Sequence, residues 1–304
     1  MRKSFIETIT KLATTNKNIY LLTADMGFGL VEPFANAHPD RFINVGVAEQ
    51  NMIGIAAGLA LSGKRVFCYS ISNFPTLRCL EQIREDVCYP NLPVCIVAGN
   101  TGLVYGALGS SHHATEDIAI MRSLPNMIVV SPGDAEETGL AVRAIVKKGV
   151  PSYLRLTASQ SNIAGGSHSY LLGRASTIFC GIDATLIATG GIISIVIRAA
   201  IMLRGCGIRA RLLDMSTIKP LDREAVVAAA AETKAIVTVE EHSVIGGLGG
   251  AVAEVLAETR GHAPLRRLGI ADKYQTTALS YDEMLKDNHL TAEDIVAEIL
   301  DALR

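Results

Sequence analysis

The sequence predicts an α/β protein built from two doubly wound units. Short apolar segments alternate with helical segments along most of its 304 residues, a pattern typical of mostly parallel sheets covered on both faces. The alternation stops once, between residues 158 and 176, where Gly, Ser, Asn and His dominate, and then restarts. We therefore expect a mostly parallel-sheet domain over residues 1–160, a linker over 161–176 and a smaller α/β domain over 177–304.

Apolar runs mark the strands, and the segments between them mark the helices. In the first unit we expect strands at residues 19–23, 42–47, 65–70, 94–98, 127–130 and 152–156, and helices at residues 3–15, 31–37, 49–61, 76–87, 118–123 and 135–147. In the second unit, with about five strands, we expect strands that include residues 184–188, 209–214, 235–240 and 265–269, and helices at residues 193–204, 223–232, 247–258 and 291–303.

The composition argues against several classes of function. The 28 basic and 30 acidic residues nearly balance, so we expect no nucleic-acid partner. No run of about 18 apolar residues occurs, and the N-terminus lacks the apolar core of a signal peptide; we expect no membrane span and a cytoplasmic location. The six cysteines show no CxxC spacing, so we interpret them as reduced core thiols and expect no metal site in this chain.

Glu49 is the only charged residue between Arg41 and Lys64. It lies between an apolar strand and a helix rich in small residues, among them Gly54 and Gly58. Such a lone carboxylate is either a helix-start residue, favoured by the helix dipole, or an acid with a chemical task. The small residues would let another backbone or a flat ligand approach the helix closely.

Three segments of the first unit resemble the pyrimidine-binding domain of transketolases. They read INVGVAEQNMIGIAAGLALSGKRVF, EQIREDVCYPNLPVCIVAGNTGL and HHATEDIAIMRSLPNMIVVSPGDAEE. In the second unit, DATLIATGG, LLDMSTIKPLD and VTVEEHSVIGGLGGAVAEVL resemble the transketolase C-terminal domain, closest in type to deoxyxylulose-phosphate synthase. The resemblance covers nearly the whole chain and implies an enzyme that uses thiamine diphosphate.

The resemblance also implies a partner subunit. Transketolases bind the cofactor diphosphate through Mg²⁺ on a separate domain that carries a GDG motif and a downstream Asn. No GDG occurs here, and 304 residues leave no room for that domain. The chain is thus similar to the C-terminal subunit of a split transketolase. We expect an N-terminal transketolase subunit to carry the GDG motif and hold Mg²⁺, with thiamine diphosphate shared between the two chains of an α2β2 heterotetramer.

The family resemblance assigns Glu49 a role. In transketolases a carboxyl group hydrogen-bonds to N1′ of the cofactor's aminopyrimidine and helps the cofactor to lose the proton at its reactive thiazolium carbon. Sharing a proton with a ring nitrogen is easier in a dry pocket, which the uncharged neighbours of Glu49 would supply.

Further cofactor-binding candidates follow from the same resemblance. Split transketolases clasp the aminopyrimidine with two aromatic residues three positions apart, and these positions are Ile71 and Phe74 here. A stacked ring would orient the heterocycle as well as bury it. Met26 follows Asp25, just after a predicted strand, where the family places a bulky apolar residue near the cofactor. For Phe74 and Met26 an ordinary core position is the alternative.

His112 lies in GSSHHATED, at the histidine of the family's G-x-(S/T)-H-Q-x-x-E motif, and His113 replaces the usual Gln. The resemblance implies that His112 contacts the substrate's carbonyl or hydroxyl group and assists proton transfer, which suits a side chain that titrates near neutrality. A solvated loop residue is the alternative.

Other positions depart from the family pattern. Leu108 replaces an acid that reads a substrate hydroxyl, Asn100 replaces a substrate-contacting histidine, and Ala158 replaces an arginine that grips the sugar phosphate. Losing a guanidinium removes a strong anion contact. Asn100, Arg155 and Arg2 are the substrate-binding candidates that remain beside His112. Either these arginines or the partner rebuild an anion site, or the small-molecule sugar is not a standard sugar phosphate, which we favour.

Three functions fit the sequence. The first is a transferase subunit that moves a two-carbon ketol unit from a ketose, or ketose phosphate, to an aldose, with a deoxyxylulose-phosphate-synthase-like enzyme as a variant. The second is the β subunit of a 2-oxo-acid dehydrogenase, and the third is a non-catalytic paralogue. The segment LPNMIVVSPGD favours the first, and Glu49 argues against the third. Glu240, Glu241 and His242 end a strand; we expect them at the domain junction and assign them no catalytic role.

Overall fold

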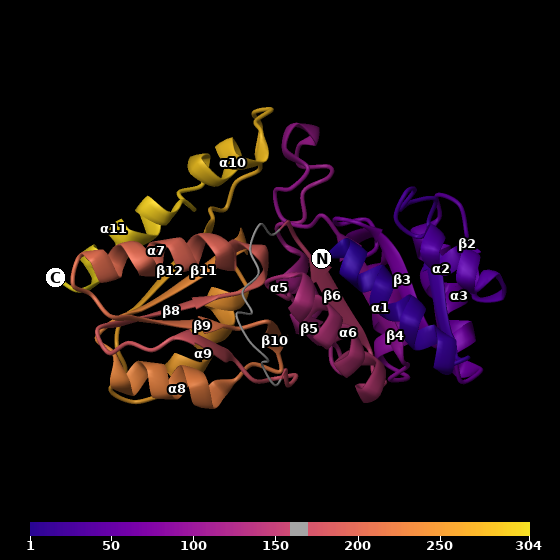
Figure 1. The fold of residues 1–304 in the computed structure, drawn as a ribbon, viewed down its shortest axis with the longest axis horizontal. Coiled ribbons are helices and arrows are strands. Elements are labelled where there is room, and N and C mark those ends of the chain that lie inside the picture. The colour runs from indigo at the N-terminus through magenta and orange to yellow at the C-terminus, as the bar shows by residue number, and fades with distance from the viewer. Residues whose placement is uncertain (159–169) are drawn as a thin grey trace.

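The chain folds into two lobes that lie side by side, as a computed structural model of residues 1–158 and 170–304 shows (Figure 1). The first lobe contains a seven-stranded sheet with the order β10-β5-β6-β4-β3-β1-β2, and the second contains a five-stranded sheet with the order β12-β11-β8-β9-β7. Most neighbouring strands are parallel, and helices cover the sheets. The predicted fold class is confirmed.

The strands of the first sheet are β1 (Ile19–Thr23), β2 (Phe42–Asn44), β3 (Arg65–Ile71), β4 (Val94–Gly99), β5 (Ile128–Val130), β6 (Ser152–Leu156) and β10 (Thr217–Lys219). The main α-helices of this lobe are α1 (Arg2–Thr15), α2 (Glu32–Ala37), α3 (Glu49–Leu61), α5 (Asp117–Ser123) and α6 (Ala135–Lys148). The remaining helical segments are η1 (Pro39–Arg41), η2 (Leu77–Cys79), α4 (Leu80–Gln82), η3 (Ile83–Cys88) and η4 (Gly106–Leu108).

The second lobe contains the strands β7 (Ser176–Phe179), β8 (Ala184–Ala188), β9 (Ala210–Asp214), β11 (Ile236–Ser243) and β12 (Leu265–Ile270). Its helices are η5 (Gly190–Ile192), α7 (Ile193–Gly205), α8 (Arg223–Glu232), α9 (Leu248–Ala257), α10 (Tyr281–Asp287) and α11 (Ala292–Ala302). Of the predicted linker, residues 161–169 lie outside the described residues, and its last residue, Ser176, begins β7. No helix in the described residues has the length and apolar content needed to cross a bilayer.

Strand β10 belongs to the second lobe in sequence but completes the sheet of the first. It pairs antiparallel with β5, with Thr217 opposite Val130. The Ser131 N–H also donates to the Ser216 carbonyl at 2.7 Å. Backbone hydrogen bonds therefore join the two lobes, which the sequence patterns did not predict.

Helix α3 follows its sequence closely. Met52, Ile53 and Ala56 are fully buried in the core that lies over β3. On the opposite side, a Cβ added to Gly54 or Gly58 would meet no atom within 4 Å. The helix thus buries one face and leaves a low, open face, while its first residue is Glu49.

Candidate functional site

The candidate site lies at the carboxyl edge of the first sheet. Strands β1, β3 and β4 are neighbours and parallel, so their carboxyl ends meet at one edge. Just beyond these ends, Asp25, Ser72 and Asn100 adopt left-handed backbone angles, with φ of 53°, 49° and 56°. Non-glycine residues in this region are uncommon and gather at functional sites.

Glu49 is buried at the first turn of α3, where 3% of the residue is exposed. Its Oε2 accepts a hydrogen bond from Arg78 Nη1 at 3.1 Å. The Gln50 side chain donates to the Arg78 carbonyl at 2.8 Å, which ties the two segments together. The predicted isolated carboxylate therefore has a cationic partner that motif reasoning missed.

Arg78 also covers the ring of Phe74. The guanidinium carbon lies 4.3 Å from the ring centroid, in cation–π geometry. The Arg78 side chain is 46% exposed, whereas the Glu49 side chain is 3% exposed. The planar guanidinium thus contacts both Phe74 and Glu49 from the solvent side. The signal in the sequence was the separation of four residues between Phe74 and Arg78, about one helical turn.

His112 also contacts Phe74. The two ring centroids are 5.3 Å apart, and the Tyr105 ring lies 5.7 Å from His112. The Ser111 hydroxyl is 3.0 Å from His112 Nδ1, and the Ser72 hydroxyl donates to the His112 carbonyl. The structure therefore brings the predicted residues Glu49, Phe74 and His112 into one line of contacts through Arg78.

Tyr105 lies near two of the predicted substrate-binding residues, Asn100 and Arg2. The Asn100 side chain and the positive charge of Arg2 both act on its hydroxyl. Burial raises the pKa of Tyr105, whereas Asn100 and the Arg2 charge act in the opposite direction. The positive charge of Arg2 also acts on the buried Tyr69 of β3. Sequence reasoning missed Tyr105, although it is the only aromatic residue between Gly99 and Ser111.

The other cofactor candidates lie at the strand ends. Ile71 ends β3 and is 7% exposed. The Asp25 N–H donates to Asn44 Oδ1 at 2.9 Å, and Asn44 Nδ2 donates to Asp25 Oδ1 at 3.2 Å. Met26 is half-buried. Within residues 1–158 and 170–304, no hydrogen bond or ion pair joins Asp25 or Met26 to Glu49.

Arg155 does not occupy a substrate-binding position, so that prediction is wrong. It is 1% exposed on β6, a strand flanked by β4 and β5. Its Nε donates to Asp117 Oδ2 at 2.7 Å, and its Nη2 donates to the carbonyls of Ala114 and Glu241 at 3.1 and 2.8 Å. The guanidinium is directed into the junction between the lobes. There it finds the anion and the acceptors that a buried cation requires.

We expect Arg155→Met to destabilise the fold by about 3–5 kcal/mol, because it leaves the Asp117 carboxylate buried without its cation. Urea unfolding of the isolated chain measures this loss. The double variant Arg155→Met with Asp117→Asn removes the orphaned charge and should recover part of it. Equal stabilities for the native chain and the single variant would contradict a buried ion pair.

Glu240 and His242 are also buried, near the end of β11. Glu240 accepts hydrogen bonds from the N–H groups of Leu248 and Gly249 at 2.6 and 2.7 Å, at the start of α9. Burial raises the pKa of Glu240 from 4.5 to about 7, and burial lowers the pKa of His242 from 6.5 to about 4. His242 lies at the junction, as expected, because its Nε2 accepts a hydrogen bond from the Ala119 N–H of the first lobe at 3.3 Å, whereas the hydrogen bonds of Glu240 stay within the second lobe.

The raised pKa of Glu240 predicts a pH-dependent stability. Between pH 4.5 and 7 the folded chain retains a proton that the unfolded chain has lost, so the Glu240 contribution to stability falls as pH rises. We expect the stability of the native chain, measured relative to Glu240→Gln, to fall by about 3 kcal/mol across this range. His242 is present in both proteins, but its Nδ1 lies 3.7 Å from Glu240 Oε2, so the difference measures this pair rather than Glu240 alone. Urea unfolding at several pH values tests this; a constant difference would contradict it.

A cavity of about 490 Å³ lies beside the site, between the lobes. Asn73, Ser111 and His113 line it from the first lobe, and Lys273 and Tyr274 line it from the second. Asn73 precedes Phe74, and Ser111 precedes His112, so this cavity adjoins the contacts described above.

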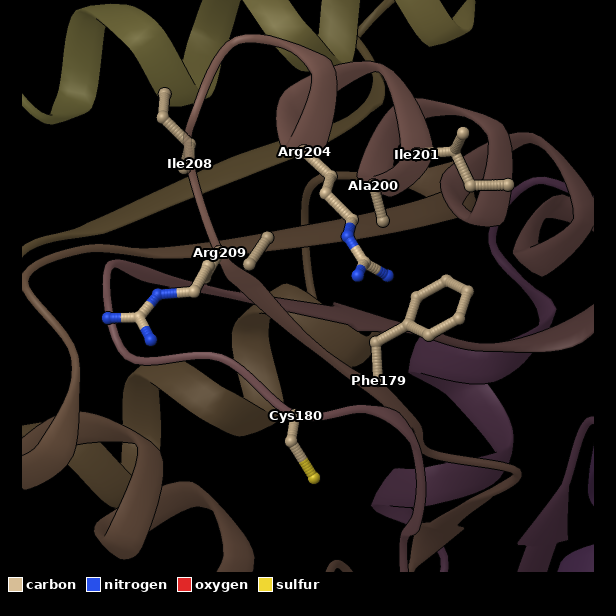
Figure 2. A pocket seen from close by; sticks show the side chains of 8 residues that line it. Phe179, Cys180, Ala200, Ile201, Arg204, Ile208 and Arg209 are labelled. Carbon is tan, nitrogen blue, oxygen red and sulfur yellow. The ribbon is translucent and has the colours of Figure 1, made fainter.

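A second cavity, of about 300 Å³, belongs to the second lobe (Figure 2). In the close view Arg204, from α7, extends toward the ring of Phe179, from β7. Its lining residues are Phe179, Cys180, Ala200, Ile201, Arg204, Ile208, Arg209 and Ala210. None of them contributes to the Glu49 contacts, so this cavity is separate from the candidate site.

Comparison with known proteins identifies the family to which the chain is similar. Residues 1–162 match the transketolase pyrimidine-binding domain, and residues 173–295 match the transketolase C-terminal domain. The chain is 41% identical over 308 residues to a putative transketolase C-terminal section of Methanocaldococcus jannaschii, covering 100% of this chain and 96% of the relative. It is 42% identical over 275 residues to an apulose-4-phosphate transketolase subunit of Phocaeicola vulgatus, covering 90% and 88%.

A solved structure agrees with the sequence matches. A split gene transketolase, described as an inactive β4 tetramer, superposes with a TM-score of 0.91 at 40% identity and covers 99% of this chain and 97% of that one. The predicted resemblance is confirmed. The chain belongs to the transketolase family, as a counterpart of the subunits of split transketolases that combine the pyrimidine-binding and C-terminal domains.

Proposed function

We propose that the chain is one subunit of a thiamine-diphosphate-dependent transketolase that transfers a two-carbon ketol unit from a ketose, or ketose phosphate, to an aldose. The observation that carries this proposal is the buried Glu49 carboxylate, connected to the Phe74 ring through Arg78, at the carboxyl edge of the first sheet. In this proposal Glu49 activates the cofactor's aminopyrimidine.

The residues present fit the pyrimidine end of the cofactor. An aminopyrimidine is a flat ring with nitrogens at its edge, so it requires an aromatic face to stack on and a carboxyl group at its rim. Phe74 and Glu49 already hold a planar, nitrogen-bearing group in this way, namely the guanidinium of Arg78. Arg78 is nearly half exposed, which leaves it room to move.

Bound thiamine diphosphate supplies a nucleophilic carbon that breaks and forms carbon–carbon bonds next to a ketone. Glu49 shares a proton with the pyrimidine nitrogen N1′, protected from water by its burial. Phe74 orients the ring. His112, beside Phe74, moves a proton at the hydroxyl or carbonyl oxygen of the sugar. Ile71, Met26 and Asp25 are proposed to form the wall of the cofactor pocket.

We propose that Arg2, Asn100 and Tyr105 bind the far end of the sugar. Arg2 is exposed, and both its charge and the Asn100 side chain act on the Tyr105 hydroxyl. A guanidinium suits an anionic group such as phosphate. The relative from Phocaeicola vulgatus is named for a sugar phosphate, apulose-4-phosphate, which supports an anionic sugar outside the standard set.

Arg2 can be tested by substrate preference. We expect Arg2→Met to raise KM for a phosphorylated aldose about 10–100-fold, because a charge-assisted contact is lost, and to change KM for the unphosphorylated aldose little. The control is Arg2→Lys, which keeps the charge without the planar fork. Steady-state kinetics of the two-subunit enzyme measure both constants. An equal rise in KM for both aldoses would assign Arg2 a structural role.

A partner polypeptide completes this proposal. We propose that an N-terminal subunit with a GDG motif binds the diphosphate and Mg²⁺, and that the two chains form a cytoplasmic α2β2 heterotetramer. Support comes from relatives named as a transketolase subunit and as a C-terminal section, and from a solved relative described as an inactive β4 tetramer.

Co-expression tests the proposed function directly. The chain is produced with the product of a neighbouring reading frame that carries GDG and a downstream Asn, and the complex is screened with phosphorylated and unphosphorylated aldoses. We expect ketol transfer only when both chains, thiamine diphosphate and Mg²⁺ are present. A stable complex that binds the cofactor but transfers no ketol unit to any aldose would contradict the proposal.

A further inference from the structure

The loop of residues 102–114 carries both Tyr105 and His112, and it closes on itself at its base. The Gly102 N–H donates to the Ala114 carbonyl, and the Ala114 N–H donates to the Gly102 carbonyl, both at 3.1 Å. Inside the loop, His113 Nε2 is 3.0 Å from the Gly106 carbonyl. The 102–114 loop is therefore a closed unit whose position depends on what holds its base.

The second lobe holds one side of this base through Glu241. Glu241 lies on β11, and its Oε1 accepts a hydrogen bond from the Leu103 N–H at 2.6 Å. Its Oε2 accepts a hydrogen bond from the Tyr281 hydroxyl at 2.7 Å, at the start of α10. The carboxylate thus links the loop backbone to two elements of the second lobe.

Arg155 holds the other side of the base. One guanidinium nitrogen, Nη2, donates to the Ala114 carbonyl of the loop and to the Glu241 carbonyl of β11. Both strands of the base are therefore bonded to the same residue of the second lobe, Glu241, by its side chain on one side and through Arg155 on the other.

The fit between loop and second lobe is close. A Cβ added to Gly102 would lie 2.2 Å from Glu241 Oε1, and a Cβ added to Gly106 would lie 2.9 Å from the Leu279 carbonyl. Both glycines also have positive φ, 71° and 46°. Figure 1 shows the loop rising beside the segment that leads into α10. The loop backbone packs directly on the second lobe, with no room for an intervening side chain.

Burying Glu241 costs free energy, because the residue is only 2% exposed and carries a carboxylate. Burial raises its pKa in spite of the nearby Arg155 charge and the two donated hydrogen bonds. An apolar residue would fill this position at a lower desolvation cost. Its acceptor oxygens, however, are the groups that fix the Leu103 N–H.

We propose that Glu241 is a positioning residue, through which the C-terminal domain holds the 102–114 loop so that Tyr105 and His112 face the substrate. The proposal rests on the proposed function for its claim about the substrate. The C-terminal domain then has a part in the reaction. Among the described residues, none from that domain takes part in the contacts that join Glu49 to Phe74 and His112.

Two variants of Glu241 distinguish the effect of losing its hydrogen bonds from the effect of losing its charge. Gln keeps both bonds, because its amide oxygen accepts from Leu103 and its amino group donates to the Tyr281 oxygen. Met is similar in size and keeps neither. Glu254→Gln is the matched control, since Glu254 joins the lobes through Arg122 at 2.6 and 3.0 Å without touching the loop.

The experiment measures two quantities for each variant: hydrogen exchange of the loop amides in the isolated full chain, and kcat and KM in the two-subunit enzyme. For Glu241→Met we expect the loop amides to exchange at least about 10-fold faster. We also expect kcat/KM to be about 100-fold lower, with most of the loss in kcat, because a small misplacement of reacting groups slows the reaction strongly. Glu241→Gln and Glu254→Gln should stay within a few-fold of the native chain. Tyr281→Phe, which removes one bond, gives intermediate values and serves if the Met variant does not fold.

The outcomes distinguish this proposal from the proposed function. Faster loop exchange with unchanged kcat/KM would overturn the positioning role, and so would equal losses in Glu241→Gln and Glu241→Met without faster exchange. If the native two-subunit enzyme transfers no ketol unit, the proposed function fails. The exchange rates then still decide whether Glu241 holds the loop.

Discussion

Ketol transfer by the two-subunit enzyme is expected to fall by about 10²–10⁴-fold when Glu49 is replaced by Gln. Gln has nearly the same shape and still accepts a hydrogen bond from Arg78, so the fold and the ion-pair partner stay in place. It cannot share a proton with a ring nitrogen of the cofactor. The loss should therefore appear in kcat at saturating cofactor and substrate.

The matched control is Glu81→Gln, an exposed carboxylate in the same lobe that lies outside the contacts of the site. It should change kcat less than about 2-fold, as expected for a surface substitution. Unchanged ketol transfer in Glu49→Gln would exclude Glu49 from cofactor activation and return it to the role of a helix-start residue.

Replacing His112 with Asn should lower kcat by about 10²-fold, the usual contribution of a positioned proton-transfer group. Asn keeps a polar side chain beside Phe74 and Tyr105 but does not titrate near neutrality. Steady-state kinetics of the two-subunit enzyme measure the loss. The neighbouring His113→Gln is the comparison variant: His113 is 3% exposed, bonds within the loop, and has a pKa lowered by burial, so its replacement should act only through the loop. A larger loss in His113→Gln than in His112→Asn would reverse the two assignments.

The sequence predicted the elements whose signal is local. Strands at residues 152–156 and 184–188 and the helix at residues 223–232 were predicted with the bounds that the structure shows. The strand predicted at residues 42–47 ends at Asn44, because the Asn44 side chain bonds to Asp25 and Gly46 turns the chain with a φ of 75°. The apolar pattern of the sequence does not reveal such tertiary hydrogen bonds, so it could not predict where this strand ends.

Two other differences have the same physical origin. Strand β10 spans Thr217–Lys219 and exists only because it meets β5 from the other lobe. The helix predicted at residues 76–87 is divided into η2, α4 and the π-helical η3. Its apolar spacing is compatible with each pitch, so packing against α3 and the sheet decides which hydrogen bonds form.

The candidate site could be predicted where a motif marked it. Glu49, Phe74 and His112 came from family motifs, and the structure places them in one line of contacts. Arg78 and Tyr105 were missed because their importance depends on which neighbours they touch. Arg155 was misassigned because its place in a strand does not reveal that its side chain is directed into the lobe junction.

Calorimetric titration of thiamine diphosphate with Mg²⁺ distinguishes a cofactor site shared by two chains from one held by this chain alone. The titration is made into the isolated chain, the isolated partner and their mixture. We expect tight binding only in the mixture, because this chain contributes the pyrimidine end and the partner contributes the diphosphate and metal contacts. Tight, Mg²⁺-dependent binding to the isolated chain would contradict the division of the cofactor site between two subunits.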